Sequence, residues 1–479
     1  MSGSSFFGDM VQTITERGRK LLSFAPRTER QPTGLAGLER LCEMLLTSRG
    51  EASGMALAAE ILQQWARLGG DEQRSFMLML FDRFGPDAAR LDEAIDAYRQ
   101  EQSPRAVLEL HQAAEPRRQE LIRRLNLAPN GISTLVGMRE RLLELKADTP
   151  ELEAVDADFS HLFISWFNRG FLILRPIDWS TPADILEKII RYEAVHEISD
   201  WDELRRRLAP PDRRCFAFFH PQLADDPLIF VEVALTRTIP GTISDVLDDS
   251  RAPIQPLDAR TAVFYSISNC QVGLRGISFG NFLIKQVVED LRRDFPKLDT
   301  FVTLSPVPGF ARWLAEERQG DHSAALSAED RANLDVLDDG GWPDDPEKAD
   351  MVRAALMPAA AWYFLKAQTP AGRPIDPVAR FHLGNGARLE RIHFLADRSS
   401  RAMRQAHGLM VNYLYKLEDI ETNHEAFAQR NEIVAAAAIR KLLRNDRPGR
   451  SLSAAGGDNG GKTGKTQGRN AASSKEFSS

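Results

Sequence analysis

Residues 264–291 read FYSISNCQVGLRGISFGNFLIKQVVEDL, which predicts a strand, a turn with three glycines and a helix. The strand begins at residue 261 in the run TAVFYSIS, whose aromatic and β-branched residues favour extended structure. The helix is indicated by apolar residues that recur at helical spacing after residue 281. A strand joined to a helix in this way predicts a domain that mixes both kinds of structure.

The glycine-rich turn predicts a site for a phosphorylated ligand. Gly273, Gly276 and Gly280 let the backbone approach a ligand without a clash of Cβ atoms. A helix that starts near Gly280 would offer unpaired N–H groups and its positive dipole end, which suit pyrophosphate. Arg275 and Lys285 would add positive charge. The alternative is a tight connection in which the glycines serve turn geometry alone.

Two polar residues stand out farther along the chain. Ser305 directly follows the strand expected at 299–304, DTFVTL, and two prolines stiffen the chain behind it. His382 lies in an apolar run within PVARFHLGNGARL (377–389) that leads into a Gly-Asn-Gly turn. A serine and a histidine react together only where the fold brings them into contact. From these patterns alone, Ser305 is more often a turn residue and His382 a structural histidine.

Strands and helices are interleaved through the rest of this part of the chain, which indicates an α/β or α+β domain. Thr181-Pro182 has the form of a helix start, a cap residue followed by proline in the first turn. The acidic residues 320–350 are expected to form a surface excursion. Further strands are expected at 215–220 and 228–236, and helices at 181–192, 354–367 and roughly 424–444.

The first third of the chain has a different pattern, because apolar residues recur there at helical spacing and strand-like runs are missing. Leu57, Ile61, Trp65 and Leu68, for example, fall on one helical face. Such stripes pack inward in a helical bundle. We therefore expect four parts: a flexible lead-in (1–34), a helical bundle domain (35–165), a catalytic domain (166–446) and a disordered tail (447–479).

The tail contains a deceptive motif. Residues 456–463, GGDNGGKT, match the phosphate-binding pattern GxxxxGK[ST]. That motif works only between a strand and a helix that aim backbone N–H groups at phosphate, and the flanking residues predict neither element. We therefore do not expect a nucleotide site in the tail.

Composition narrows the class of protein. With 479 residues the chain is long enough for two or more domains, and 43% hydrophobic residues are ordinary for a globular protein. The net charge of −7 argues against a broad nucleic-acid-binding surface. No run is long enough to span a membrane. The three scattered cysteines indicate a reducing compartment, and we expect a cytoplasmic protein, since acidic residues weaken a mitochondrial presequence.

An ordered set of segments resembles the malonyl-CoA decarboxylase family. No single segment is diagnostic, but together they run through about 250 residues in the same order. They are SWFNRGFLILRPIDW (165–179), FYSIS (264–268), GLRGISFGNFLIKQVV (273–288), LSPVPGF (304–310), DPVARFHLGNGARL (376–389) and GLMVNYLY (408–415).

The resemblance implies an α+β protein, with an N-terminal helical domain followed by a catalytic domain of the GNAT acetyltransferase fold. It also implies malonyl-CoA as the substrate and a homo-oligomer. We expect no cofactor and no metal, because the thioester itself is the electron sink, and no nucleic-acid or membrane partner. The family's catalytic serine maps to Ser305 and its catalytic histidine to His382. Substrate-binding positions map to Arg275, Gly276, Ile277, Ser278, Phe279, Gly280, Asn281, Ser305 and Tyr415.

The expected reaction removes CO2 from malonyl-CoA and leaves acetyl-CoA. Ser305 would orient the malonyl group and exchange a proton with His382, and His382 would supply the proton to the carbanion, a task that suits a pKa near neutral. Two alternatives keep the CoA site. One is a GNAT-type acyltransferase, because fold alone does not set chemistry. The other is a non-catalytic acyl-CoA sensor.

Overall fold

The computed structural model describes residues 13, 34–48, 50–223, 225–277, 283–320 and 322–443. Three of our expectations therefore lie outside the described residues. They are the tail at 447–479 with its GxxxxGK[ST] match, the lead-in apart from residues 13 and 34, and the positions Ser278, Phe279, Gly280 and Asn281 of the glycine-rich turn.

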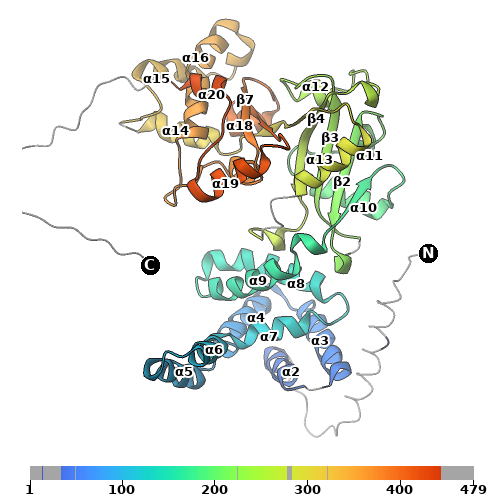
Figure 1. Ribbon diagram of the computed structural model, residues 1–479, viewed down its shortest axis with the longest axis vertical. Coiled ribbons are helices and arrows are strands. Elements are labelled where there is room, and N and C mark those ends of the chain that lie inside the picture. Colours follow the sequence, from blue (N-terminus) through green and yellow to red (C-terminus); the bar gives the residue numbers. More distant parts are fainter. Residues whose placement is uncertain are drawn as a thin grey trace, which may run out of the picture. The chain divides into compact units, whose positions relative to one another are not determined.

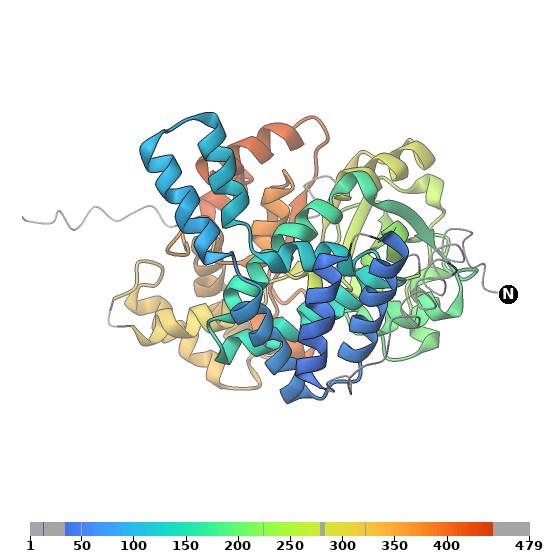
Figure 2. The ribbon, with the colours of Figure 1, turned by 90° about the horizontal axis from the view of Figure 1, so that it is seen from below.

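Residues 35–166 are helical, as the sequence predicts, and run from blue to teal in Figures 1 and 2. The stripe of Leu57, Ile61 and Trp65 is buried, which confirms that the apolar faces pack inward. Helix α4 ends at Arg83, just before Gly85-Pro86, a pair that favours the end of a helix. The helices are α2 (Leu35–Thr47), α3 (Glu51–Trp65), α4 (Gly70–Arg83), α5 (Ala88–Gln100), α6 (Pro104–Ala114), α7 (Arg117–Leu125), α8 (Gly131–Leu145) and α9 (Leu152–Trp166).

A mixed sheet follows, with the strand order β1-β2-β3-β4-β5-β8-β6 and with β7 also paired to β8. Strands β1 to β4 form an antiparallel meander, and β4 then pairs with β5 in parallel. The strands are β1 (Ile173–Ile177), β2 (Arg213–Phe219), β3 (Pro227–Thr236), β4 (Thr261–Asn269), β5 (Thr300–Thr303), β6 (Ser305–Pro306), β7 (Arg388–His393) and β8 (Met410–Leu414).

Helices cover both faces of the sheet because its strands carry apolar side chains on both sides. Cys215, Ala217 and Phe219 of β2 pack with α10 (Ala183–Tyr192) and α11 (Trp201–Leu208). Phe216 and Phe218 point to the opposite face, in the same apolar cluster as α13 (Leu283–Asp294). The parallel β4–β5 pair needs a crossover connection, which α13 provides.

The remaining helices follow the strands of the second half of the chain. They are α12 (Ser244–Leu247), α14 (Phe310–Gln319), α15 (Ala328–Leu334), α16 (Pro346–Leu365), α17 (Pro377–Gly384), α18 (Ser400–Ala406), α19 (Ile420–Arg430) and α20 (Ala437–Leu442). Together with the sheet they confirm the α+β class with a helical N-terminal part. The strands expected around residues 215–220, 228–236, 261–268 and 299–304 are all present.

Two expectations are wrong in detail. The acidic segment 320–350 is more than a surface excursion, because Leu326, Leu334 and Trp342 are buried while the acidic residues between them mostly face outward. The last helix, expected at 424–444, is two helices, α19 and α20. Asn431 interrupts it with a φ of 51°, a left-handed conformation that asparagine adopts more readily than most residues.

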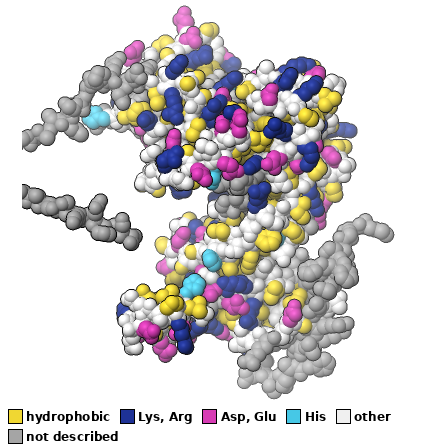
Figure 3. Space-filling model, in the orientation of Figure 1, with side chains coloured by type: hydrophobic (Ala, Val, Ile, Leu, Met, Phe, Trp, Pro, Cys, Tyr) yellow, Lys and Arg dark blue, Asp and Glu magenta, His cyan; other side chains and the backbone are white. Residues whose placement is uncertain are grey.

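No helix within the described ranges is long and apolar enough to cross a membrane. On the face shown in Figure 3, basic and acidic side chains are interspersed.

Candidate active site

Three short elements bring Ser305 and His382 together. Ser305 opens β6, immediately after β5, and pairs across the sheet with Val411 of β8. His382 lies in the last turn of α17, which starts with Pro377 in its first turn. The Asp376 carboxylate caps this helix by accepting the Ala379 N–H at 2.7 Å. The cap and the proline fix the first residue of α17. They therefore also fix the position of His382 in its last turn.

The serine and histidine side chains are in contact and almost completely buried. Ser305 Oγ lies 3.3 Å from His382 Nε2, and the two residues are 6% and 3% exposed. The Ser305 hydroxyl donates to Thr303 Oγ1 at 2.9 Å, and Thr303 Oγ1 also accepts the Tyr413 N–H at 3.1 Å. Because its own proton points to Thr303, the Ser305 oxygen is arranged to accept a hydrogen bond from Nε2–H.

The other ring nitrogen of His382 is bonded as well. Nδ1 lies 2.8 Å from the hydroxyl oxygen of Tyr415. A hydroxyl can donate to a neutral imidazole or accept from a charged one, so this contact serves both protonation states. Tyr415 is placed to orient the histidine ring, and it is not among the described residues that line the adjacent cavity, so its expected contact with the substrate stays a prediction.

Sequence reasoning missed Tyr413 and Thr303. The Tyr413 ring stacks on His382, with centroids 4.6 Å apart and planes at 24°. The alternation of Tyr413 and Tyr415 in the strand-like run MVNYLY was a usable signal, because residues two apart share one face of a strand. For Thr303 no comparable signal exists, because its role depends on the pairing of β5 and β8.

Burial without a charged partner dominates the acid–base behaviour of His382. Desolvation lowers its pKa from 6.5 to about 3. The expected near-neutral pKa is therefore wrong for the ligand-free protein, and the imidazole is neutral at pH 7. The sequence could not show this, since it does not reveal that the ring lies between Tyr413 and the serine without a neighbouring carboxylate.

A cavity of about 250 Å³ opens next to the pair. It is smaller than the roughly 300–1,000 Å³ of pockets that hold a drug-sized ligand, so it suits the acyl end of a larger molecule. The described residues that line it include no Asp, Glu, Lys or Arg. They are Val195, Phe264, Tyr265, Ile267, Asn269, Ser305, Pro306, Pro377, Val378, Phe381 and His382.

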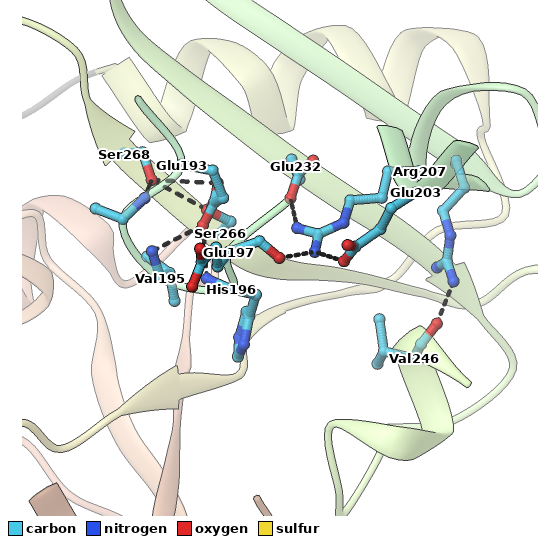
Figure 4. A network of polar contacts seen from close by, with 12 residues as sticks. Glu193, Val195, His196, Glu197, Glu203, Arg207, Glu232, Val246, Ser266 and Ser268 are labelled. Carbon is cyan, nitrogen blue, oxygen red and sulfur yellow. Dashed lines mark hydrogen bonds and ion pairs between the residues drawn. The ribbon is translucent and has the colours of Figure 1, made fainter. Parts of the chain in front are cut away.

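A polar network lies on the same sheet (Figure 4). The Glu193 carboxylate accepts the N–H groups of Val195 and His196 and the hydroxyls of Ser266 and Ser268. This network fixes the backbone of Val195, which forms part of the cavity wall.

A second part of the network is ionic. Arg207 contacts Glu232 at 3.2 Å and Glu203 at 2.6 Å. Arg207 also lines a second cavity, of about 440 Å³, together with Arg206 and Arg251. Three of the four arginines that line this cavity are paired with a carboxylate of the chain, and the fourth, Arg213, donates to the Val246 carbonyl, so this cavity is the weaker candidate for an active site.

The start of the glycine-rich turn is described. Leu274 to Ile277 form a β-turn, closed by an N–H···O bond of 3.0 Å from Ile277 to Leu274. Arg275 has φ −56° and ψ 130°, and Gly276 has φ 81°. These angles define a type II turn, which requires glycine at its third position. Lys285, the second cation expected near the turn, forms a 2.8 Å ion pair with Glu421.

Comparison with known proteins gives the family of the chain. Residues 84–167 match the family model of the malonyl-CoA decarboxylase N-terminal domain, and residues 170–453 match that of the C-terminal domain. The mitochondrial malonyl-CoA decarboxylase of Anser anser anser is 33% identical over 420 residues, which are 81% of this chain and 83% of the relative. The corresponding protein of Rattus norvegicus is 32% identical over 433 residues, 83% of this chain and 87% of the relative.

Solved structures agree with this assignment. A malonyl-CoA decarboxylase from Agrobacterium vitis is 69% identical with a TM-score of 0.82, covering 85% of this chain and 99% of that one. One from Rhodopseudomonas palustris is 60% identical with a TM-score of 0.83, covering 86% and 100%. The matches run through both the helical part and the sheet, and the chain belongs to the malonyl-CoA decarboxylase family.

Proposed function

We propose that the chain decarboxylates malonyl-CoA in the 250 Å³ cavity, with Ser305 and His382 as the catalytic residues. The observation that carries the proposal is the 3.3 Å contact between Ser305 Oγ and His382 Nε2 at the wall of a cavity lined, in the described part of the chain, by uncharged side chains. A serine–histidine pair can move a proton, which is the one proton transfer that the reaction needs.

The uncharged wall favours loss of CO2. In the malonyl thioester the negative charge is concentrated on the carboxylate, which loses hydration when it enters the cavity. As the bond between the carboxylate and the α-carbon breaks, its electrons move into the thioester carbonyl and the charge becomes more dispersed. Apart from the proton that His382 takes up, the described wall offers the carboxylate no cation, so the ground state is stabilised less than it would be by a fixed ion pair. To donate to the malonyl group, the Ser305 hydroxyl turns its proton from Thr303 Oγ1 toward the cavity.

His382 responds to the charge of the substrate. The negative charge in the cavity raises the pKa of the imidazole from its low value in the ligand-free protein, so the ring takes up a proton when malonyl-CoA binds. After CO2 leaves, the Ser305 O–H proton passes to the α-carbon and the Nε2–H proton passes to Ser305 Oγ. Overall, one malonyl-CoA anion and one proton give one acetyl-CoA and one CO2.

The turn that begins at Arg275 completes the proposal as the pyrophosphate site of CoA, with Arg275, Gly276, Ile277, Ser278, Phe279, Gly280 and Asn281 as its residues. The support is the type II turn directly after β4, the strand that supplies Phe264 and Tyr265 to the cavity. A homo-oligomer in the cytoplasm also remains part of the proposal. Its support is the resemblance and the three unpaired cysteines.

The test is the release of CO2 and acetyl-CoA from malonyl-CoA by the purified protein. We expect equal amounts of both products, and His382→Asn should lower turnover roughly 10²–10⁴-fold because the proton source is removed. His407→Asn is the matched control. His407 is also partly buried, burial also lowers its pKa, and its φ of 51° is one that asparagine tolerates, so turnover should stay near normal.

Two outcomes would count against the proposal. If folded wild-type protein binds malonyl-CoA but releases no CO2, acyl transfer or sensing becomes the better explanation. If His382→Asn retains near-normal release, the serine–histidine assignment is wrong even though the decarboxylase activity stands.

A further inference from the structure

The central peptide of a β-turn can take two orientations, which distinguish type I from type II turns. At Leu274–Ile277 it has the type II orientation. In a type I turn the peptide between Arg275 and Gly276 would be flipped by about half a turn. Because a trans peptide holds C=O and N–H on opposite sides, whatever binds the Arg275 carbonyl also decides where the Gly276 N–H points.

The residue that binds this carbonyl comes from the helical part of the chain. Arg139 of α8 donates from Nη1 to the Arg275 carbonyl at 3.0 Å and to the Gly273 carbonyl at 2.7 Å. Both carbonyls are thereby turned toward α8. The Gly276 N–H is turned away from α8 and is left for another acceptor.

Arg139 is itself held rigidly. Its Nε donates to Asp156 at 2.7 Å and its Nη2 donates to Ser160 at 3.0 Å, while Lys146 contacts the other oxygen of Asp156 at 2.6 Å. Arg139 is 3% exposed. Every nitrogen of the guanidinium is engaged, a pattern that the single ammonium of lysine cannot reproduce.

Gly273 shows how closely the turn is seated on α8. A Cβ atom at this position would lie 2.0 Å from the carbonyl oxygen of Val136, so any larger residue would push the turn off the helix. Two independent features, a buried arginine and a glycine without room for a side chain, therefore join the same turn to the same helix.

We propose that Arg139 is a positioning residue for CoA, which sets the peptide orientation of the pyrophosphate turn from the helical domain. The inference rests on the proposed role of the turn that begins at Arg275. It makes the helical part of the chain a component of the CoA site, because without Arg139 the 275–276 peptide is free to flip and to present a carbonyl oxygen to the phosphate.

The experiment compares two substrates in wild type and Arg139→Lys. Malonyl-CoA carries the pyrophosphate, and malonyl-pantetheine presents the same thioester without it. In the variant, KM for malonyl-CoA should rise about 10- to 100-fold with little change in kcat, the effect of losing charge-assisted hydrogen bonds that order a binding loop. Turnover of malonyl-pantetheine should stay within about twofold, because the cavity is intact.

Arg118→Lys is the matched control. Arg118 forms a buried ion pair with Asp158 within the helical part and contacts none of the turn residues. It should lower thermal stability comparably and leave the preference for malonyl-CoA unchanged. Should Arg139→Lys fail to fold, Gly273→Ala tests the same contact from the other side and should give the same selective rise in KM.

The outcomes separate the two proposals. If wild type uses both thioesters equally well, the turn does not bind pyrophosphate and both the site and the inference fail. If wild type prefers malonyl-CoA and Arg139→Lys keeps that preference, only the inference is overturned. The inference is also overturned if Arg118→Lys loses the preference to the same extent, since general destabilisation would then explain the effect.

Discussion

His382 and Glu232 are both buried beside one sheet, but their surroundings differ. The histidine has a serine, two tyrosines and a cavity around it, and the only cause of its lowered pKa is desolvation. Glu232 lies beside Arg207, and burial still raises its pKa to about 8. One group is buried where a ligand can supply the missing charge. The other is buried beside an arginine of the chain, and desolvation outweighs that fixed partner, so the carboxyl is mostly protonated at pH 7.

This difference distinguishes a site that responds to a ligand from a network that holds the fold. A bound anion can restore the charged form of His382, because desolvation is the one cause of its lowered pKa and an opposite charge offsets desolvation. On the Glu193–Arg207 side of the sheet in Figure 4, the chain itself supplies the ion pairs and most hydrogen bonds, although Arg207 Nε and Glu232 Oε1 have no partner among the described residues.

The largest effect that separates the two regions should come from Arg207→Met. Removing the arginine breaks its buried hydrogen bonds to Glu232, Glu203 and the Glu197 carbonyl, which should lower the free energy of unfolding by about 1–3 kcal/mol at pH 7. Urea denaturation measures the loss, and kcat of the folded fraction should change little. The double variant Arg207→Met/Glu232→Leu should recover most of the stability. A single variant as stable as wild type would show that the ion pair does not hold the fold.

A change of at most about 1.4 kcal/mol per pH unit should appear in the pH dependence of stability, with opposite signs in the two regions. The folded-state pKa of His382 is about 3 against 6.5 when unfolded, so the unfolded chain binds the proton first and stability is lost as pH falls from 6.5 to 3. The folded-state pKa of Glu232 is about 8 against 4.5, so stability is lost as pH rises from 4.5 to 8.

These signs are checked by measuring the free energies of unfolding of wild type, His382→Asn and Glu232→Gln between pH 4 and 8. The free energy of unfolding of wild type minus that of His382→Asn should rise with pH below 6.5, by at most about 1.4 kcal/mol per pH unit. The free energy of unfolding of wild type minus that of Glu232→Gln should fall as pH rises. Two differences of the same sign would mean that one of the groups is not buried as described.

The sequence predicts the strands and helices around the site well, because each has a local signal. The apolar run at 228–236 appears as β3, and the helix expected after Thr181-Pro182 appears as α10, although Pro182 and not Thr181 holds its cap position. The break between α19 and α20 escapes prediction, since a left-handed Asn431 is one of several conformations that asparagine can adopt.

The candidate site could be predicted only in part. Ser305 and His382 came from the resemblance, while their contact depends on β6 and α17 meeting in space. The low pKa of His382 and the bond from Arg139 to the glycine-rich turn depend on residues separated by tens to more than a hundred positions. Such contacts leave no periodic or spacing signal in a single sequence.

The central claim is that His382 is neutral in the free protein and becomes charged when a carboxylate enters the cavity. Calorimetric titration at pH 7, in buffers with different ionisation enthalpies, counts the protons taken up on binding. The ligand is a thioether analogue of malonyl-CoA, which keeps the carboxylate but lacks the thioester carbonyl that decarboxylation requires. Acetyl-CoA, which has no carboxylate, is the matched control.

We expect uptake approaching one proton for the thioether analogue, almost none for acetyl-CoA, and none for either ligand with His382→Asn. Equal uptake with the two ligands, or uptake that survives in His382→Asn, would contradict the account, because the substrate carboxylate would then not be what charges the histidine.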